Sequence, residues 1–447
     1  MLGGRVGAVP GGLGLGFRTM VDCPLNMDLG ELPDEDPRLY AHAQVAHIAC
    51  GGHAGDEASM RRALEACAHH GTRAGAHPSF EDREHFGRVE LRVTPEVLRA
   101  QVAAQCTRLA ELGREVGVPV RSAKPHGALY HAANREPALA RAVVDGVVEA
   151  LGAGVLLVGP GMGALREAAR EAGLAYAREG FADRGTWEDG SLIPRGEPGA
   201  VVTDAAVARE KALRLALSGT VDTLCVHGDS PGAVELAREV RSVLDVLALR
   251  LEPLGEGALR LVLPERLPRG GVLEALQALP GVGDVVVGEA HACVYFDPAS
   301  PPEDPRRVLA RLVGKEGGAE APRLVTVRVR YDGADLPSVA EQVGLSVDDV
   351  ALLHASREYS VRGVGFLPGF AYLGDVDARI AVPRLSTPRP SVPALAVGLA
   401  GRRTGVYPFA SPGGWNLIAT SVDFSPFDAV RGALLRPGDR VLFERVD

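Results

Sequence analysis

The sequence feature that most constrains the fold is an alternation of short apolar runs with amphipathic stretches from residue 21 to about residue 250. The apolar runs include 45–49, 73–76, 153–158 and 223–226, and the stretches with helical periodicity include 57–70, 95–115 and 163–172. Such an alternation indicates repeated βα units, which form a parallel sheet or a closed β/α barrel.

Several of the apolar runs end in clusters of polar residues, as in AHIACGGHAGD, RAGAHPSFEDR, VRSAKPHGALYH and TLCVHGD. In a β/α barrel the carboxyl ends of the strands meet at one mouth, where such side chains converge. We therefore expect a polar site there. The candidate residues, each beside a Gly or Pro turn, are Asp28, Glu31, His53, Asp56, His77, Asp82, Lys124, His126, Asp183, Arg184, His227 and Asp229.

The pattern changes near residue 250, and 447 residues exceed what one hydrophobic core usually serves. Residues 251–313 read as strand, helix, strand, helix, which predicts a small α+β domain. We expect 314–323 to be a linker, and the short strands punctuated by Gly and Pro in 324–447 predict a closed antiparallel barrel. We expect the Gly-rich residues 1–20 to be disordered, or to precede a true start at Met20.

Composition narrows the range of partners and compartments. A formal net charge of -9 without any basic block argues against binding to nucleic acid or an anionic membrane. No run approaches the ~20 apolar residues of a membrane span. The six cysteines form no CxxC motif, which favours reduced thiols in a cytoplasmic enzyme. Small molecules and protein partners remain.

Two chemistries are compatible with the polar clusters. In a metal hydrolase, His53, His77, His227 and a carboxylate such as Asp28 would bind Zn²⁺ or a similar ion and lower the pKa of a bound water. The sequence contains no HExxH-type spacing that would support this reading.

The alternative is a phosphoryl-transfer or amide-hydrolysing site. Lys124 would neutralise phosphate oxygens, His126 would move a proton, and Asp28 or Asp183 would orient water or a metal. Lys124 is one of only three lysines in the chain, which favours this second chemistry. Its structural alternative is an ion pair beneath the barrel mouth.

Six motifs of the first region occur in the order of one family: LNMDLGE (25–31), ACGGHAGD (49–56), GAHPSFEDREHFGR (75–88), KPHGALY (124–130), FADRGTWEDGSLIPR (181–195) and CVHGD (225–229). Over residues 20–250 the chain resembles the LamB/YcsF family, known as the 5-oxoprolinase A subunit. The resemblance implies a glycoside hydrolase/deacetylase-like β/α barrel. Gly52 departs from the family, which usually has an aromatic residue there, and we expect this to alter how the pocket closes.

The resemblance implies ATP-dependent cleavage of 5-oxo-L-proline to L-glutamate, with ADP and phosphate as the other products, and ATP and Mg²⁺ as cofactors. No GxxxxGK[ST] motif occurs, so the sequence does not locate the nucleotide. The catalytic candidates are Asp28, Lys124, His126, Asp183 and His227. The substrate-binding candidates in this region are Asn26, His53, His77, Asp56, Arg184 and Asp229.

The C-terminal part resembles a second family, KipI, also described as the 5-oxoprolinase B subunit or allophanate hydrolase subunit 1. The motifs are HASREYSVRGVGFLPGFAYLG (354–374), PRLSTPRPSVPALAVGLAG (383–401), TGVYP (404–408) and SPGGWNLI (411–418). The resemblance implies a small N-terminal domain and a cyclophilin-like barrel. Arg389, Trp415 and Asn416 are candidates for a ligand or partner face, with Trp415 as an exposed aromatic.

The C-terminal part also departs from its family. Leu395–Ala396 replaces the usual Gly-Ser, and residues 419–421 replace the usual Gly-Arg-Thr, which weakens anion binding there. The two resemblances together imply a fusion of two subunits and a missing third, KipA-like subunit. The alternatives are a metal-dependent deacetylase-like hydrolase and a regulatory protein similar to inhibitors of a sensor histidine kinase.

Overall fold

A computed structural model describes residues 23–187, 192–264, 267, 269–288, 290–314 and 323–447. The chain forms two compact units, of which one ends at Ala248 and the other begins at Leu249. Residues 1–20 and most of the expected linker at 314–323 lie outside the described residues. No described helix is long and apolar enough to cross a membrane, and the six cysteines form no disulfide among the described residues.

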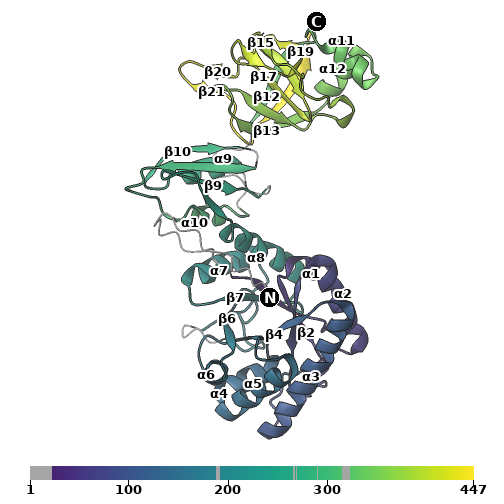
Figure 1. Cartoon of the computed structure of the whole chain (residues 1–447), viewed down its shortest axis with the longest axis vertical. Helices are drawn as coiled ribbons and strands as arrows, with labels where there is room; N and C mark the ends of the chain where they lie inside the picture. The colour runs from purple at the N-terminus through teal and green to yellow at the C-terminus, as the bar shows by residue number, and fades with distance from the viewer. Residues whose placement is uncertain (1–22, 188–191, 265–266, 268, 289, 315–322) are drawn as a thin grey trace, which may run out of the picture. The chain divides into compact units, whose positions relative to one another are not determined.

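The first unit is a closed barrel of seven parallel strands. Its residues are coloured purple to teal in Figure 1. The strands are β1 (Leu25–Leu29), β2 (Val45–Ala49), β3 (Arg73–His77), β4 (Val120–Ala123), β5 (Leu156–Gly159), β6 (Ala175–Phe181) and β7 (Thr223–His227). Each strand pairs in parallel with the next, and β1 pairs with β7 to close the barrel. The expectation of a β/α barrel is therefore confirmed.

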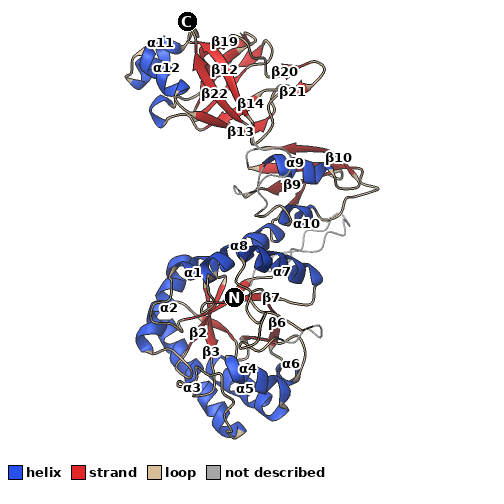
Figure 2. Ribbon diagram, turned by 180° about the vertical axis from the view of Figure 1, so that it is seen from behind, coloured by secondary structure: helices blue, strands red, loops and turns tan. Residues whose placement is uncertain are grey.

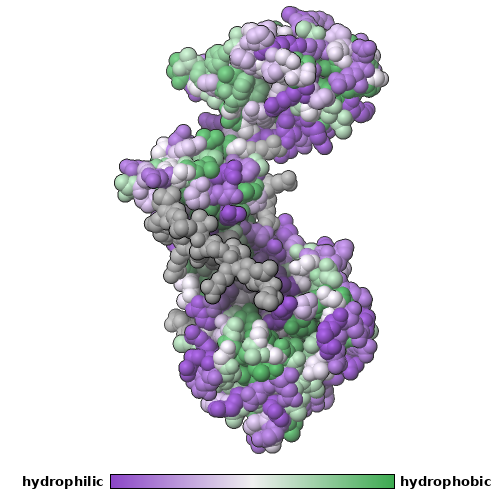
Figure 3. All heavy atoms as spheres, viewed as in Figure 1, coloured by the Kyte–Doolittle hydropathy of each residue, from purple (hydrophilic) through white to green (hydrophobic). Residues whose placement is uncertain are grey.

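Helices surround these strands, as the blue and red ribbons of Figure 2 show. They are α1 (Arg38–His42), α2 (Glu57–His70), α3 (Pro95–Val116), α4 (Gly127–Arg135), α5 (Pro137–Leu151), α6 (Ala164–Glu171), α7 (Ala205–Ser218) and α8 (Ala233–Leu247). Each helix buries one face, as α2 does with Met60, Ala63, Leu64 and Cys67. The outer faces of α2 and α3 are correspondingly hydrophilic in Figure 3.

Burial of the strands on both sides explains their composition. All five residues of β1 and all five of β2 are buried, and most of them are apolar. The exceptions are Asn26, Asp28 and His47, whose polar side chains are buried in the barrel and hydrogen-bonded or ion-paired there. A buried polar group requires such a partner, so these positions mark the site rather than the core.

The second unit contains a four-stranded antiparallel sheet with strand order β10-β11-β9-β8. Its elements are β8 (Leu251–Pro253), β9 (Ala258–Val262), α9 (Arg269–Gln277), β10 (Val282–Val287), β11 (His291–Phe296) and α10 (Pro305–Ala310). Each of the two strands expected here is thus a pair of strands. The first pair turns at Gly255, whose φ of 71° lies in the left-handed region that glycine adopts without strain.

The second unit also contains a closed barrel with strand order β12-β19-β16-β17-β14-β13-β22. These strands are β12 (Leu324–Arg330), β13 (Glu358–Val364), β14 (Ala371–Gly374), β16 (Ala396–Ala400), β17 (Arg403–Val406), β19 (Asn416–Ser421) and β22 (Arg440–Arg445). Most neighbours are antiparallel as expected, but β12 and β22 pair in parallel over six residues. Periodicity cannot reveal this, because strand direction depends on tertiary pairing.

Shorter elements complete the second barrel and cover it. The helices are α11 (Leu336–Val343), α12 (Val347–Ala355) and the 3₁₀ turn η1 (Ala378–Ile380), and the short strands are β15 (Arg389–Val392), β18 (Ser411–Gly413), β20 (Phe427–Asp428) and β21 (Gly432–Ala433). The barrel core contains Val327, Leu373 and Phe443, and Leu336 and Val350 of the two helices pack against it.

Candidate active site

A cavity of about 440 Å³ opens at the carboxyl ends of the strands of the first barrel. Its walls are formed by Asp28 of β1, His77 of β3, Glu179 of β6 and His227 of β7, together with the segment that follows β4. This volume lies within the range of small-molecule sites. The polar clusters at the ends of the strands therefore converge as the sequence predicts.

Lys124 lies at the floor of this cavity with 2% of its surface exposed. Its Nζ atom is 2.5 Å from Asp28 Oδ1 and 2.9 Å from Glu179 Oε1. It also donates to Asn26 Oδ1 at 3.0 Å and to Cys225 Sγ at 3.4 Å. The ammonium group is thus surrounded by protein acceptors, two of them carboxylates.

These ion pairs keep both partners charged despite burial. Burial alone would raise the pKa of Asp28, but His77 and Lys124 outweigh it and keep this pKa well below its usual value. Burial would likewise lower the pKa of Lys124, yet Asp28, Cys225 and Glu179 raise it. The floor of the cavity is therefore ionised at neutral pH.

His227 and Asp183 form a second pair beside this floor. Nδ1 of His227 donates to Asp183, whose Oδ2 lies at 3.0 Å and also accepts from the His227 backbone N–H and from Ser230 Oγ. Burial would lower the pKa of His227, but the carboxylate of Asp183 outweighs it and the pKa is raised. Because Nδ1 already donates to Asp183, Nε2 is the ring nitrogen that can exchange protons. It lies 3.9 Å from Asp28 Oδ2.

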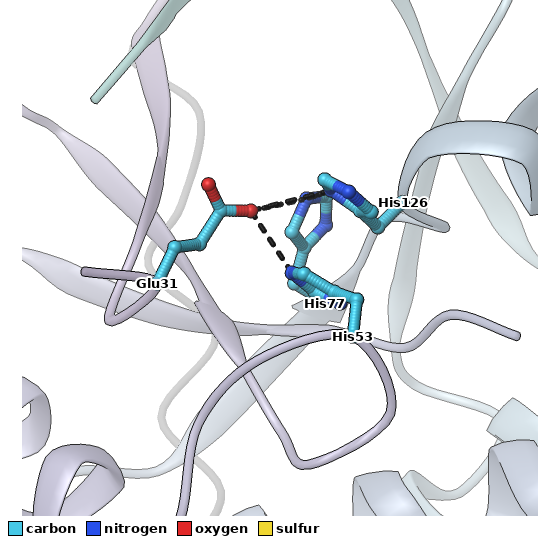
Figure 4. A group of neighbouring side chains, drawn as sticks. All are labelled: Glu31, His53, His77 and His126. Atoms are coloured by element: carbon cyan, nitrogen blue, oxygen red, sulfur yellow. Dashed lines mark hydrogen bonds and ion pairs between the residues drawn. The ribbon is translucent and has the colours of Figure 1, made fainter. Parts of the chain in front are cut away.

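A third group combines Glu31 with three histidines, and all four side chains are drawn in Figure 4. Glu31 Oε1 lies 3.0 Å from His53 Nε2 and 3.2 Å from His126 Nδ1. The His53 and His126 rings are stacked with centroids 3.7 Å apart, and His77 meets His126 edge to face. Burial lowers the pKa of His53 to about 4 and also lowers that of His126.

Arginines form the outer rim of the cavity. Asp229 accepts from Arg88 Nη2 at 2.6 Å and from Arg195 Nη1 at 3.0 Å. Arg184 instead donates to the backbone oxygens of Ala200 and Ile193, which anchors the segment that carries Arg195. The rim is thus positively charged above an acidic floor.

The structure brings most of the predicted barrel residues to this cavity. Those that line it are Asp28, His77, Lys124, His126, Arg184, His227 and Asp229. Asn26, His53 and Asp183 lie behind them in direct contact. Asp56 is separate from the group, because it is the exposed N-cap of α2 and accepts from the Ser59 backbone N–H.

The three candidates of the C-terminal part belong to the second unit. The expectation that Trp415 is exposed is wrong, because only 5% of it is exposed and it packs against Phe370 and Tyr372. Asn416 is also buried, and its amide donates to the backbone oxygens of Pro383 and Leu399. Arg389 forms an ion pair with Asp335. The Trp-Asn pair follows two glycines, which suggests an exposed turn, but the closed barrel buries it.

Gly52 does not line the cavity, so its departure from the family does not act on the pocket directly. A Cβ atom there would meet Ser79 Oγ at 2.4 Å and Gln105 Oε1 at 2.6 Å. Glycine fits this position because the loop after β2 packs closely against Ser79, which follows β3, and against Gln105 of helix α3.

Sequence reasoning assigned no role to Glu31 and overlooked Glu179, Arg88 and Arg195. Glu179 carried a usable signal, since a carboxylate inside a strand that is buried in a parallel barrel needs a cationic partner. The two arginines lie on loops, where no periodicity distinguishes a rim residue from any other surface residue.

Comparison with known proteins agrees with this architecture. Residues 23–258 match the LamB/YcsF family, and residues 251–433 match the carboxyltransferase domain, subdomain C and D. The 5-oxoprolinase A subunit of Streptomyces avermitilis is 45% identical over 250 residues, which cover 52% of this chain and 98% of the relative. That of Pyrococcus abyssi is 37% identical over 247 residues, covering 52% and 96%.

A crystal structure of a lactam utilization protein from Thermus thermophilus is 36% identical and covers 50% of this chain and 96% of that protein, with a TM-score of 0.47. The family match alone spans more than half of the 447 residues. The chain therefore belongs to the LamB/YcsF family and carries a KipI-like carboxyltransferase C and D domain in residues 251–433.

Proposed function

We propose that this chain is a component of a 5-oxoprolinase, and that its barrel cavity binds 5-oxo-L-proline for ATP-dependent cleavage to L-glutamate, ADP and phosphate. The names of its relatives support the substrate. The observation that carries the proposal is the cavity in which His227, held by Asp183, faces the ionised Asp28 beneath a rim of arginines. These are groups for proton transfer and anion binding on one small polar ligand.

The reaction needs activation because a five-membered lactam is a poor electrophile. Transfer of the terminal phosphoryl group of ATP to the lactam oxygen releases ADP and makes the carbonyl carbon reactive. Addition of one water and cleavage of the ring C–N bond then give an acyl phosphate, and a second water releases phosphate and glutamate. In this scheme His227 accepts the proton of the attacking water and returns it to the leaving ring nitrogen.

We propose that Arg195 and Arg88 recognise the substrate carboxylate, because guanidinium groups bind carboxylates through paired hydrogen bonds. Asp229 positions both side chains at 2.6–3.0 Å. For Lys124 we propose a positioning role, since its donors already face Asn26 and two carboxylates. It keeps the cavity floor ionised rather than contacting phosphate.

ATP and Mg²⁺ are proposed as cosubstrate and cofactor. Mg²⁺ prefers a shell of oxygen ligands. The carboxylate of Asp183 accepts from His227 and Ser230, and that of Asp28 is paired with Lys124, so these side chains do not fit a Mg²⁺ site of their own. We therefore assign Mg²⁺ to the nucleotide phosphates and route no step through these residues.

The relatives are named as subunits, which supports a complex of several different chains. We propose that the further partner is a third, KipA-like subunit. Joining the LamB/YcsF and KipI-like parts in one chain sets their ratio at one to one and raises their effective concentration without new contacts.

The test is glutamate release from 5-oxoproline by the purified chain, with and without a KipA-like subunit, ATP and Mg²⁺. We expect ATP-dependent turnover that falls at least about 100-fold in His227→Gln, the scale typical of a lost general acid–base group. His70→Gln, an exposed histidine at the end of α2, is the matched control and should keep full activity. Absence of turnover with the cognate partner would contradict the proposal and favour a deacetylase or a regulator.

A further inference from the structure

The cluster of Glu31, His53, His77 and His126 is not needed for the proton transfers above, yet it is the larger of two groups of potential metal ligands among the described residues. One ligand atom from each residue lies within 4.8 Å of every other. The four side chains are at most 9% exposed. They come from the loops after β1 and β2, the end of β3 and the segment after β4.

The hydrogen bonds at the back of two rings determine which nitrogens face the centre. His77 Nδ1 donates to the backbone oxygen of Lys124 at 2.7 Å, and His126 Nε2 donates to that of Phe86 at 3.0 Å. A carbonyl oxygen can only accept, so these two nitrogens carry the protons. In the neutral rings His77 Nε2 and His126 Nδ1 are therefore bare lone pairs.

These two lone pairs point at each other and at a carboxylate. His77 Nε2 and His126 Nδ1 are 2.9 Å apart, and Glu31 Oε1 lies 3.7 Å from the first and 3.2 Å from the second. Three acceptors at such distances repel one another unless a proton or a cation lies between them. Nδ1 of His53 has no hydrogen-bond partner among the described residues, so His53 is not fixed by a bond of its own at the back.

The separations match those of a metal coordination shell. Metal–ligand bonds of about 2.0–2.1 Å imply ligand atoms about 3.3 Å apart in a tetrahedron. The separations of Glu31 Oε1 from the three histidines and of His77 from His126 run from 2.9 to 3.7 Å, and His53 Nε2 lies within 4.8 Å of both other rings' ligand atoms. Donation of the outer ring nitrogen to a backbone carbonyl, as in His77 and His126, is also the usual arrangement for a metal-binding histidine.

We propose that Glu31, His53, His77 and His126 bind one divalent transition-metal ion of the Zn²⁺ class. Three imidazole nitrogens and one carboxylate oxygen suit Zn²⁺, Co²⁺ and similar ions, whereas Mg²⁺ and Ca²⁺ require mainly oxygen. Glu31, His77 and His126 also line the cavity, so the ion borders the space assigned to the substrate. The inference does not depend on the proposed reaction.

The experiment uses the full chain, stripped of metal with a chelator, dialysed and titrated with Zn²⁺ or Co²⁺ at pH 7.5. We expect one tightly held ion per chain by elemental analysis, and Co²⁺ absorption bands of tetrahedral intensity. His53→Ala and Glu31→Gln should each weaken binding at least about 100-fold, beyond the 10–100-fold loss typical of outer-shell changes. His70→Ala should bind as the wild type does, and circular dichroism shows whether each variant is folded.

A second group of potential ligands, Asp28, Cys225 and His227, gives the competing outcome. An ion bound there would show a thiolate-to-cobalt charge-transfer band and would be lost in Cys225→Ser. That result, or binding unchanged in both His53→Ala and Glu31→Gln, or no stoichiometric ion in excess Zn²⁺, would overturn the inference. Metal content is measured without turnover, so an inactive chain that binds the ion contradicts only the proposed function.

Discussion

Replacing Lys124 with methionine tests the electrostatics of the cavity floor most directly. The substitution keeps a long apolar stem and removes the charge that Asp28 and Glu179 share. At an effective dielectric constant of about 20, an ion pair at 2.5–2.9 Å has a Coulomb energy of about 6 kcal/mol. The cost of burying the ammonium offsets part of this energy, and breaking a buried pair typically costs about 3–5 kcal/mol. We expect a loss of that size at pH 7.5.

The loss should depend on pH in a defined direction. In the wild type the folded pKa of Asp28 is lowered, so its contribution is fully present above about pH 4 and is lost only in stronger acid. Without Lys124 the burial penalty is opposed only by His77 and His227, and the pKa of Asp28 rises. The folded variant then binds protons more readily than the unfolded chain, so its stability recovers as the pH falls from 7.5 to 5.5.

The assay is urea unfolding followed by circular dichroism at 222 nm, which reports mainly on the helices of the first barrel. Glu179→Gln added to Lys124→Met should restore part of the stability, because it removes one of the two carboxylates left without a partner. An equal loss at both pH values, with no recovery in the double variant, would refute the electrostatic reasoning and assign the effect to packing.

Two further predictions concern other parts of the chain. His354 accepts from Tyr331 and donates to Thr404 in the second barrel, and burial lowers its pKa to about 3. Between pH 3 and 6.5 only the unfolded chain binds this proton, so His354 should make the barrel about 2 kcal/mol less stable at pH 5 than at pH 7. His354→Gln should remove this slope, which Trp415 fluorescence during urea unfolding in a Trp187→Phe background can measure. In Gly185→Ala, a Cβ 1.9 Å from the Gly199 backbone oxygen should displace the segment with Arg195 and raise the KM for 5-oxoproline severalfold. Gly196→Ala, where a Cβ meets nothing within 4 Å, should leave KM unchanged.

The sequence alone determines the secondary structure of this protein to a large extent. The run at 45–49 is β2, the periodic stretch at 57–70 is α2, and that at 95–115 is α3 with one added residue. Local patterns suffice because an amphipathic helix or a buried strand carries its own periodicity. The polar residues after these runs also identified the mouth of the barrel, since parallel strands all end at the same side.

Tertiary structure decided which of those residues meet. Lys124 and Glu179 are 55 positions apart, and only the closure of the barrel sets their distance at 2.9 Å. Glu31 received no role from the sequence, but its position just after β1 brings it to three histidines at the ends of the next three strands. Asp56 has the same residue type as Asp28 and lies in an equally suggestive motif, yet it caps a helix. Local periodicity encodes each element, whereas contacts between distant residues follow from strand register and ring closure, which no local pattern contains.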